Sequence, residues 1–134
     1  MLSDAQAALV EQMAASVGGH VFARELLSDG VAEGVARCDY AGNRCQARVD
    51  WINPIADRGI VDLKTADEID SFELSMRAFG YLHPVAFYRA LVAAVSCHVL
   101  PVHIIAVEKR ELRRCRETGD WFTRYESLRL VERL

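Results

Sequence analysis

Two short segments of alternating side chains restrict the fold of this chain more than any other feature of its sequence. Apolar and polar residues alternate over residues 45–51 (CQARVDW), which is typical of a β-strand with one buried face. Residues 60–65 (IVDLKT) have the composition of a second strand. The connection contains an Asn53-Pro54 step and Gly59, both typical of turns. The sequence therefore predicts an antiparallel pair of strands.

The polar positions of these two strands carry two carboxylates and a lysine. Alternation places Asp50 on the polar face of the first strand, and Asp62 and Lys64 together on one face of the second. Antiparallel pairing would bring Asp50 and Asp62 close to each other. Adjacent carboxylates repel unless a cation lies between them, and a hard divalent cation with oxygen ligands is the usual solution. The pattern therefore favours a Mg²⁺ site over a zinc site.

A Mg²⁺ ion held by these carboxylates would suit the hydrolysis of a phosphodiester. It could polarise a phosphoryl oxygen, stabilise the leaving oxygen and lower the pKa of an attacking water. Lys64, on the same face, would orient that water or neutralise charge that develops in the transition state. A half-buried sheet that exposes an Asp, an Arg and a Lys to solvent would carry the same residues, so the three positions alone leave both interpretations open.

The spacing resembles the P-D...(D/E)-x-K pattern of the PD-(D/E)XK nuclease superfamily, with Val49-Asp50 followed by Asp62-Leu63-Lys64. The runs CQARVDW, GIVDLKT, SFELS and FGYLHPVAFY also resemble the exonuclease VIII (RecE-like) branch of phages and prophages. The likeness is strongest over residues 30–88. It implies an α/β (α+β) fold, the restriction-endonuclease-like core, in which helices flank a mixed central sheet.

The resemblance also implies further site residues. The run LLSDGVAE resembles the family segment whose glutamate lies near the metal, so Glu33 would be a third carboxylate. The metal ligands would be Asp50, Asp62, Glu33 and the backbone carbonyl of Leu63. In the family, a Gln and a Tyr four residues apart on a later helix point towards the site, and Tyr88 stands at the Tyr position. The expected catalytic residues are Lys64, Asp62, Asp50, Glu33 and Tyr88.

Several departures from the family pattern bear on activity. Pro84 stands at the Gln position, where it should kink a continuous helix at a cost of about 3 kcal/mol unless it begins a new helix. His83 would partly replace the missing amide. His20 does not match the family histidine by position, and the chain after Lys109 departs from the family pattern. We therefore expect a nuclease core shortened at both ends, whose exposed sheet edge favours oligomerisation.

The resemblance implies a Mg²⁺-dependent deoxyribonuclease, with Mn²⁺ as a substitute ion. It further implies 5′ to 3′ exonuclease digestion of double-stranded DNA in phage-type recombination, a homo-oligomer, and a single-strand annealing recombinase as partner. A catalytically impaired remnant that serves as a DNA-binding or assembly module stays open because of Pro84 and the short flanks. If the protein were wholly structural, the presence of all these site residues in one chain would be a coincidence.

Composition limits the remaining possibilities. The chain has 134 residues, 51% hydrophobic and 26% charged, which suits one globular domain over residues 1–134. Its formal net charge of −3 provides no overall basic field for nucleic acid. The best local basic patch is residues 109–116, where Lys109 and four arginines are diluted by glutamates. As a solvated surface, this segment needs no DNA to explain it.

The cysteine pattern argues against disulfides and bound metal clusters. The four cysteines lack C-x-x-C spacing and no secretory signal is recognisable, so we expect reduced thiols and a cytoplasmic location. A zinc site with Cys97, His98 or His103 would lack a fourth ligand. The iron–sulfur cluster of some superfamily members needs a tight C-terminal cysteine group that is not found here. No apolar run approaches the roughly 20 residues that span a bilayer, so no membrane partner is expected.

Local patterns predict the order of the elements as helices, three strands, helices and a strand, which is the core order of the superfamily. A capping box at Ser3 and Gln6 begins a helix that Gly18-Gly19 ends, and a short helix covers 21–27. A strand over 31–38 leads to a hairpin at 40–43. The remaining predictions are helical stripes at Phe72, Met76 and Phe79 and at Val85, Tyr88, Val92 and Val95, a strand over 99–107, and a closing helix over 124–134.

Overall fold

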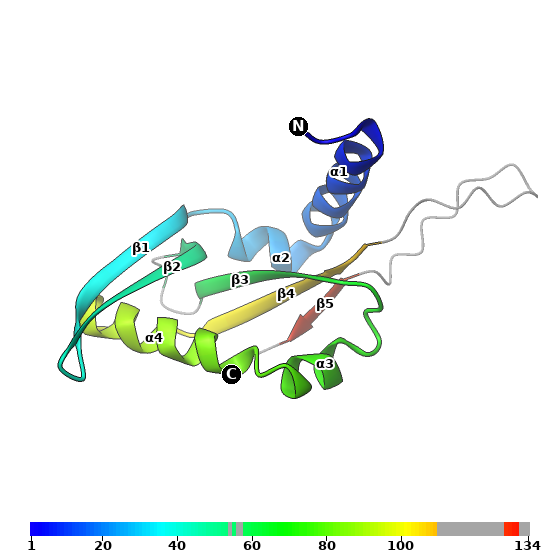
Figure 1. The fold of residues 1–134 in the computed structure, drawn as a ribbon. Helices are drawn as coiled ribbons and strands as arrows, with labels where there is room; N and C mark the ends of the chain where they lie inside the picture. Colours follow the sequence, from blue (N-terminus) through cyan, green and yellow to red (C-terminus); the bar gives the residue numbers. More distant parts are fainter. Residues whose placement is uncertain (54, 56–57, 110–127, 132–134) are drawn as a thin grey trace, which may run out of the picture.

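A five-stranded sheet with helices on both faces forms the body of the chain (Figure 1). The computed structural model describes residues 1–53, 55, 58–109 and 128–131. In chain order the elements are α1 (Asp4–Gly19), α2 (Val21–Leu26), β1 (Val31–Tyr40), β2 (Asn43–Asn53), β3 (Gly59–Ala66), α3 (Phe72–Ala78), α4 (Leu82–Ser96), β4 (Val102–Glu108) and β5 (Leu128–Val131). This is the mixed, helix-flanked α+β architecture that the sequence predicted.

The sheet is mixed because one connection crosses over it. The strand order is β1-β2-β3-β4-β5. β1, β2 and β3 form an antiparallel meander, whereas β3 and β4 run parallel and β5 pairs antiparallel with β4. Parallel neighbours need a crossover connection, which α3 and α4 provide. β2 pairs with β3 only through Trp51, Ile52 and Asn53, so β1 and β2 continue alone as a two-stranded ribbon.

The ribbon is closed by the hairpin that the sequence predicted. Tyr40 pairs with Asn43, and the two residues between them, Ala41 and Gly42, have φ angles of 50° and 80°. A two-residue turn with two positive φ angles matches the twist of the flanking strands and therefore keeps the register fixed. β1 runs two residues further than the predicted strand, as far as Tyr40.

One face of the sheet is covered by α4 and α3. Under α4 the buried cluster consists of Ala36, Ala47, Val49, Ile60, Val85, Leu91, Val92 and Val102. Cys38 and Cys45 pack against it as half-buried side chains, so Cys45 lies on the apolar face of its strand as predicted. Next to it, Phe72 and Met76 of α3 pack on the neighbouring part of the sheet, around Ile104.

The opposite face is covered by α2 and by one end of α1. Ala23, Leu26, Val61 and Ile105 are buried there, and the ring of Phe22 meets that of His103 edge-on at 5.9 Å. α1 itself has no buried residue and projects from the body (Figure 1). Its first turn carries the predicted capping box of Ser3 and Gln6.

Pro84 does not break a helix. It is the third residue of α4, in the first turn, where backbone N–H groups have no partner within the helix. The preceding turn at Gly80, with φ of 66°, separates α3 from α4, and the two helices are bent by 77°. The chain therefore begins a new helix here, although Pro84 is its third residue rather than its first.

Other local predictions were wrong in instructive ways. Leu128–Val131 is strand β5 rather than part of a helix, because β4 offers an edge to which it pairs; the rest of the predicted helix lies outside the described residues. β4 begins at Val102, directly after Pro101, rather than at residue 99. Phe79 and Val95 are 72% and 52% exposed, so neither belongs to the core.

The helices of the described residues do not include one that is long and apolar enough to cross a membrane. Only α3 and α4 taken together reach the required length and composition, and they do so across their 77° bend.

Two glycines give a matched test of this architecture. Gly59 begins β3 with φ of 62°, and a Cβ there would collide with the backbone of Pro101, so Gly59→Ala should lower the free energy of unfolding by more than about 1 kcal/mol. Gly18 lies in α1 with nothing within 4 Å of an added Cβ, so Gly18→Ala should raise it by up to about 1 kcal/mol. Urea denaturation measures both, and changes of the same sign would contradict the described backbone.

Candidate active site

The candidate site lies where β2 and β3 separate. The antiparallel ladder between them ends at the pair Trp51 and Val61, one position before Asp50 and Asp62 would face each other. Asp50 Oδ2 instead accepts a hydrogen bond of 2.8 Å from the backbone N–H of Leu63. A carboxylate thus takes the place of a ladder hydrogen bond at the point where the sheet opens.

The backbone of Leu63 also directs an oxygen towards this opening. The N–H and C=O of one residue in a strand point to the same neighbour, because paired residues exchange both hydrogen bonds. Since the N–H of Leu63 meets Asp50, its carbonyl lies on the same side of β3. The family resemblance expects this carbonyl to be a metal ligand.

Asp50 departs from the alternation that predicted its position. Val49 and Ile52 both pack on the α4 side, whereas Trp51 packs on the α2 side. Residues on one face of a regular strand are separated by an even number of positions, but Val49 and Ile52 are three positions apart. The regular alternation of β2 is therefore interrupted at Asp50. Strict alternation predicted that the carboxylate points outward from the sheet, but it points along the sheet towards β3.

Asp62 and Lys64 share one face of β3, as predicted. Lys64 Nζ lies 2.6 Å from Asp62 Oδ2. The side chain of Asp62 is only 11% exposed, whereas that of Lys64 is 32% exposed. Their neighbours on β4 are Ile104 and Ala106, which belong to the apolar core under α3. The ion pair therefore lies at the border between this core and solvent.

Burial raises the pKa of Asp62 above its ordinary value of 3.8, because the apolar surroundings disfavour the charged form. The ammonium group of Lys64 acts in the opposite direction through a hydrogen bond and its charge, and the charge of Asp50 raises the pKa further. Asp50 accepts its hydrogen bond from Leu63, the residue that follows Asp62, so the two carboxylates belong to neighbouring positions at the opening of the sheet. The buried Oδ2 of Asp62 has no partner other than Lys64 among the described residues.

These donors fit a hard divalent cation. Two carboxylates and a carbonyl are oxygen ligands, and Mg²⁺ in proteins is commonly held by one or two carboxylates while it keeps several waters. A second positive charge would also compensate the buried Oδ2 of Asp62. No group of three or more His, Cys, Asp or Glu side chains that could hold a metal occurs in the described part of the chain. Asp50 and Asp62 alone would leave most of the coordination of such an ion to water or substrate.

Glu33 is not brought to Asp62. The register of β1 places it opposite Asp50, but the ladder skips this position, and Glu33 has a φ of 55°, which is uncommon outside glycine. Its carboxylate lies 2.9 Å from Nε of Arg48, and both side chains are well exposed. Such exposed pairs contribute little to stability. The expected third carboxylate is thus beside the site but held by an arginine.

Among the described residues, Tyr88 and His83 form no hydrogen bond, ion pair or ring contact with Asp62 or Lys64. Tyr88 is half-buried in α4 and packs against the cluster that contains Val49 and Ile60, with its ring 6.5 Å from that of Phe87. His83 is exposed, and its side chain has no hydrogen bond among the described residues. The described structure gives no sign that His83 replaces the family amide.

The structure places Asn53 differently from the sequence prediction, and it also shows where the possible zinc ligands lie. Asn53 was assigned to a turn, but it is fully buried and joins α2 to the β2–β3 connection: its Nδ2 donates to the Leu26 carbonyl, and its Oδ1 accepts from Ile55 N–H. His103 is buried, whereas Cys97 and His98 are exposed, so these three side chains do not form a metal group. Residues 110–116 of the basic segment lie outside the described residues.

The raised pKa of Asp62 predicts a stability difference that depends on pH. Above its folded pKa the charged carboxylate is less favourable in the folded chain than in the unfolded chain, so its contribution to stability falls as pH rises from below 3.8 towards neutrality. The free energy of unfolding of Asp62→Asn should therefore rise relative to that of the unsubstituted protein as the pH increases from about 4 to about 7. Urea titrations in the presence of a chelator measure this difference. Asp67→Asn, with an exposed carboxylate, is the control. A difference for Asp62→Asn that is constant with pH would contradict the assignment.

Comparisons with known proteins agree with this fold. The crystal structure described as "Putative exonuclease" from Eubacterium rectale is similar with a TM-score of 0.72 at 18% sequence identity, covering 96% of this chain and 46% of that chain. At this identity the likeness shows the fold alone, and the present chain spans less than half the length of that protein. No curated protein sequence matches.

The family comparison covers most of the chain. The profile of the family described as a PDDEXK-like domain of unknown function (DUF3799) matches residues 2–117. This range includes both carboxylate strands and the helices that cover them. The chain therefore belongs to the PDDEXK-like DUF3799 family, and with it to the PD-(D/E)XK nuclease superfamily.

Proposed function

We propose that this domain is a metal-dependent deoxyribonuclease that hydrolyses DNA phosphodiester bonds. The observation that carries the proposal is the arrangement of Asp50, Asp62 and Lys64. Asp50 is fixed by the N–H of Leu63, and the ammonium group of Lys64 lies 2.6 Å from the carboxylate of Asp62. Family membership supports a nuclease-type function. The structural neighbour is described as a "Putative exonuclease", and we extend that description to attack on DNA ends as part of the proposal.

In this proposal Asp50, Asp62 and the carbonyl of Leu63 hold Mg²⁺, for which Mn²⁺ can substitute. Glu33 would assist after release from Arg48. When bound, the ion supplies Lewis-acid activation of the scissile phosphate and of a water molecule. Two carboxylates and a carbonyl leave coordination positions for both.

The side chains of the domain position the reacting groups. The partly exposed ammonium of Lys64 can reach solvent and would orient the attacking water or neutralise charge on the phosphate in the transition state. Asp62 keeps that ammonium at the border of the core. The apolar side chains around Ile104 exclude water from one side, which strengthens these charge interactions. The hydrogen bond from Leu63 fixes the direction of Asp50.

The finer assignments belong to the same proposal. Sequence resemblance to the exonuclease VIII (RecE-like) branch supports 5′ to 3′ digestion of duplex ends in phage-type recombination with a single-strand annealing recombinase. The cysteine pattern supports a cytoplasmic location. A homo-oligomer is supported by β1, which is an edge strand in the described sheet and could pair with a second copy. Tyr88 would contribute by packing beside the site rather than by direct contact with the ion pair.

An impaired nuclease that binds DNA without turnover is the second candidate. It is favoured by Pro84 at the family Gln position and by the exposed His83, neither of which contacts the Asp62–Lys64 pair in the described structure. If this candidate function is correct, the unsubstituted protein should bind duplex DNA but show no detectable cleavage. The following experiment therefore measures binding and cleavage on the same substrate.

Two ion pairs make a matched test of the nuclease proposal. Asp62→Asn and Lys64→Ala should each lower the cleavage rate of end-labelled linear duplex at least about 100-fold with Mg²⁺ or Mn²⁺, because each removes a group that stabilises transition-state charge or its metal. Asp67→Asn and Lys109→Ala alter the exposed pair at 3.4 Å and should leave the rate unchanged. A covalently closed circle separates exonuclease from endonuclease activity. Full cleavage by either variant of the first pair would overturn the catalytic assignment.

A further inference from the structure

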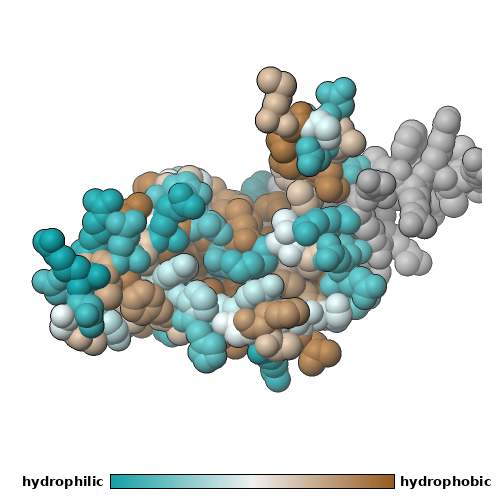
Figure 2. All heavy atoms as spheres, viewed as in Figure 1, coloured by the Kyte–Doolittle hydropathy of each residue, from teal (hydrophilic) through white to brown (hydrophobic). Residues whose placement is uncertain are grey.

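The face of the β1–β2 ribbon that points away from α4 is exposed and rich in arginine. Ala36, Cys38, Cys45, Ala47 and Val49 pack on the α4 side, so the residues that alternate with them face outward. The outward set is Val35, Arg37, Asp39, Arg44, Gln46 and Arg48, and every member is exposed. Figure 2 shows hydrophilic side chains gathered over this end of the molecule.

The register arranges these residues as three opposed pairs, each with one arginine. Arg48 faces Val35, Arg37 faces Gln46, and Arg44 faces Asp39. Successive pairs are about 7 Å apart along the strands, so the row of arginines covers roughly 13 Å. Duplex DNA carries one phosphate per 3.4 Å along each strand, so this row matches about four phosphates of one strand.

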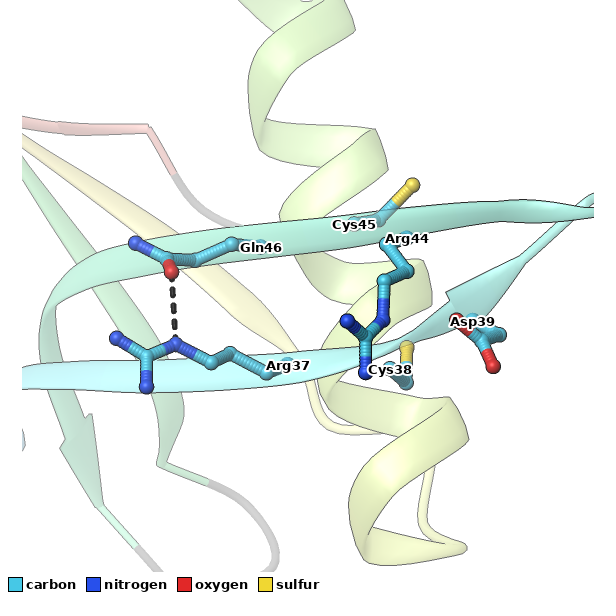
Figure 3. A pocket seen from close by; sticks show the side chains of 6 residues that line it. All are labelled: Arg37, Cys38, Asp39, Arg44, Cys45 and Gln46. Atoms are coloured by element: carbon cyan, nitrogen blue, oxygen red, sulfur yellow. Dashed lines mark hydrogen bonds between the residues drawn. The ribbon is translucent and has the colours of Figure 1, made fainter.

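The guanidinium groups keep donors for a ligand. Arg37 uses Nε for a hydrogen bond of 2.7 Å to Gln46 Oε1, and Figure 3 shows its terminal nitrogens directed away from Gln46. Arg44 forms no hydrogen bond or ion pair with any described residue, although Asp39 faces it across the ribbon. A guanidinium has five N–H donors. Both side chains border a shallow hollow of about 520 Å³ (Figure 3).

The row of arginines leads to the candidate site. Arg48 precedes Asp50 by two residues on β2, and its side chain binds Glu33 at the side of the site. The domain as a whole has a net charge of −3, so these arginines form a local field of opposite sign. A polyanion attracted to the ribbon would therefore extend towards the opening of the sheet at Asp50, whereas Asp62 and Lys64 lie on the α3 side of the sheet.

We propose that the outward face of the β1–β2 ribbon binds the phosphodiester backbone of duplex DNA through Arg37, Arg44 and Arg48 and leads it towards the opening of the sheet at Asp50. This inference rests on the proposed nuclease function. The arginines contact phosphates and position the duplex without reading bases, so binding is independent of sequence. Phosphate engagement of Arg48 also frees the carboxylate of Glu33.

The test is equilibrium binding of a labelled duplex by fluorescence anisotropy, in EDTA so that no cleavage occurs, over a series of KCl concentrations. The double variant Arg37→Ala/Arg44→Ala should bind more weakly, and its log–log salt dependence should become less steep by about 2, since each lost phosphate contact accounts for about 0.9. The control Arg24→Ala/Lys109→Ala removes the same charge from exposed positions elsewhere and should keep the slope of the unsubstituted protein.

A second variant separates lost contacts from lost folding. Arg37→Lys/Arg44→Lys keeps both charges and should retain most of the salt dependence, and all variants should keep the urea midpoint of the unsubstituted protein because the side chains are exposed.

An unchanged slope in the double alanine variant, or no duplex binding by the unsubstituted protein, would overturn the proposed ribbon interface. Failure of the nuclease proposal has a different signature. Duplex binding that depends on the arginines, with no cleavage by the unsubstituted protein in Mg²⁺ or Mn²⁺, would contradict that proposal and leave the interface supported.

Discussion

The separation of β2 from β3 after the pair Trp51 and Val61 is the constraint on which the candidate site depends. If the ladder continued, Asp50 and Asp62 would be ordinary neighbours in a sheet, and the backbone groups of Leu63 would be used by β2. Because the strands part, the Leu63 N–H binds the Asp50 carboxylate at 2.8 Å. The opening therefore supplies a fixed carboxylate and a carbonyl oxygen at one position.

The electrostatics of the site argue for function rather than for stability. Asp62 has an unfavourable, largely buried carboxylate, which Lys64 only partly compensates. Burying an ion pair is costly, and apolar residues of similar size are often at least as stabilising. A chain selected only for stability would have little reason to keep Asp62 beside Ile104. A cation and a phosphate at this border would balance the charges, which connects the unfavourable burial of Asp62 to the proposed chemistry.

The sequence predicted the features that depend on local pattern. The strands that carry Asp50, Asp62 and Lys64 were predicted from period-two alternation and turn residues. The side chains of Asp62 and Lys64 lie on one face of β3, as expected. The direction of Asp50 could not be predicted, because it depends on where the ladder between two strands ends. The pairing of Glu33 with Arg48 depends on an unusual φ of 55° in β1. Leu128–Val131 has a helical pattern but became a strand because β4 offers an edge.

We propose that Asp50 and Asp62 form one divalent-cation site at the opening of the sheet. Anomalous diffraction from crystals soaked in Mn²⁺ tests it most directly, because the signal locates the ion without reference to activity. The account predicts an anomalous peak between the two carboxylates, next to the Leu63 carbonyl, that disappears in Asp62→Asn crystals. A saturating soak that leaves this position without a peak, with the two carboxylates turned apart, would contradict it.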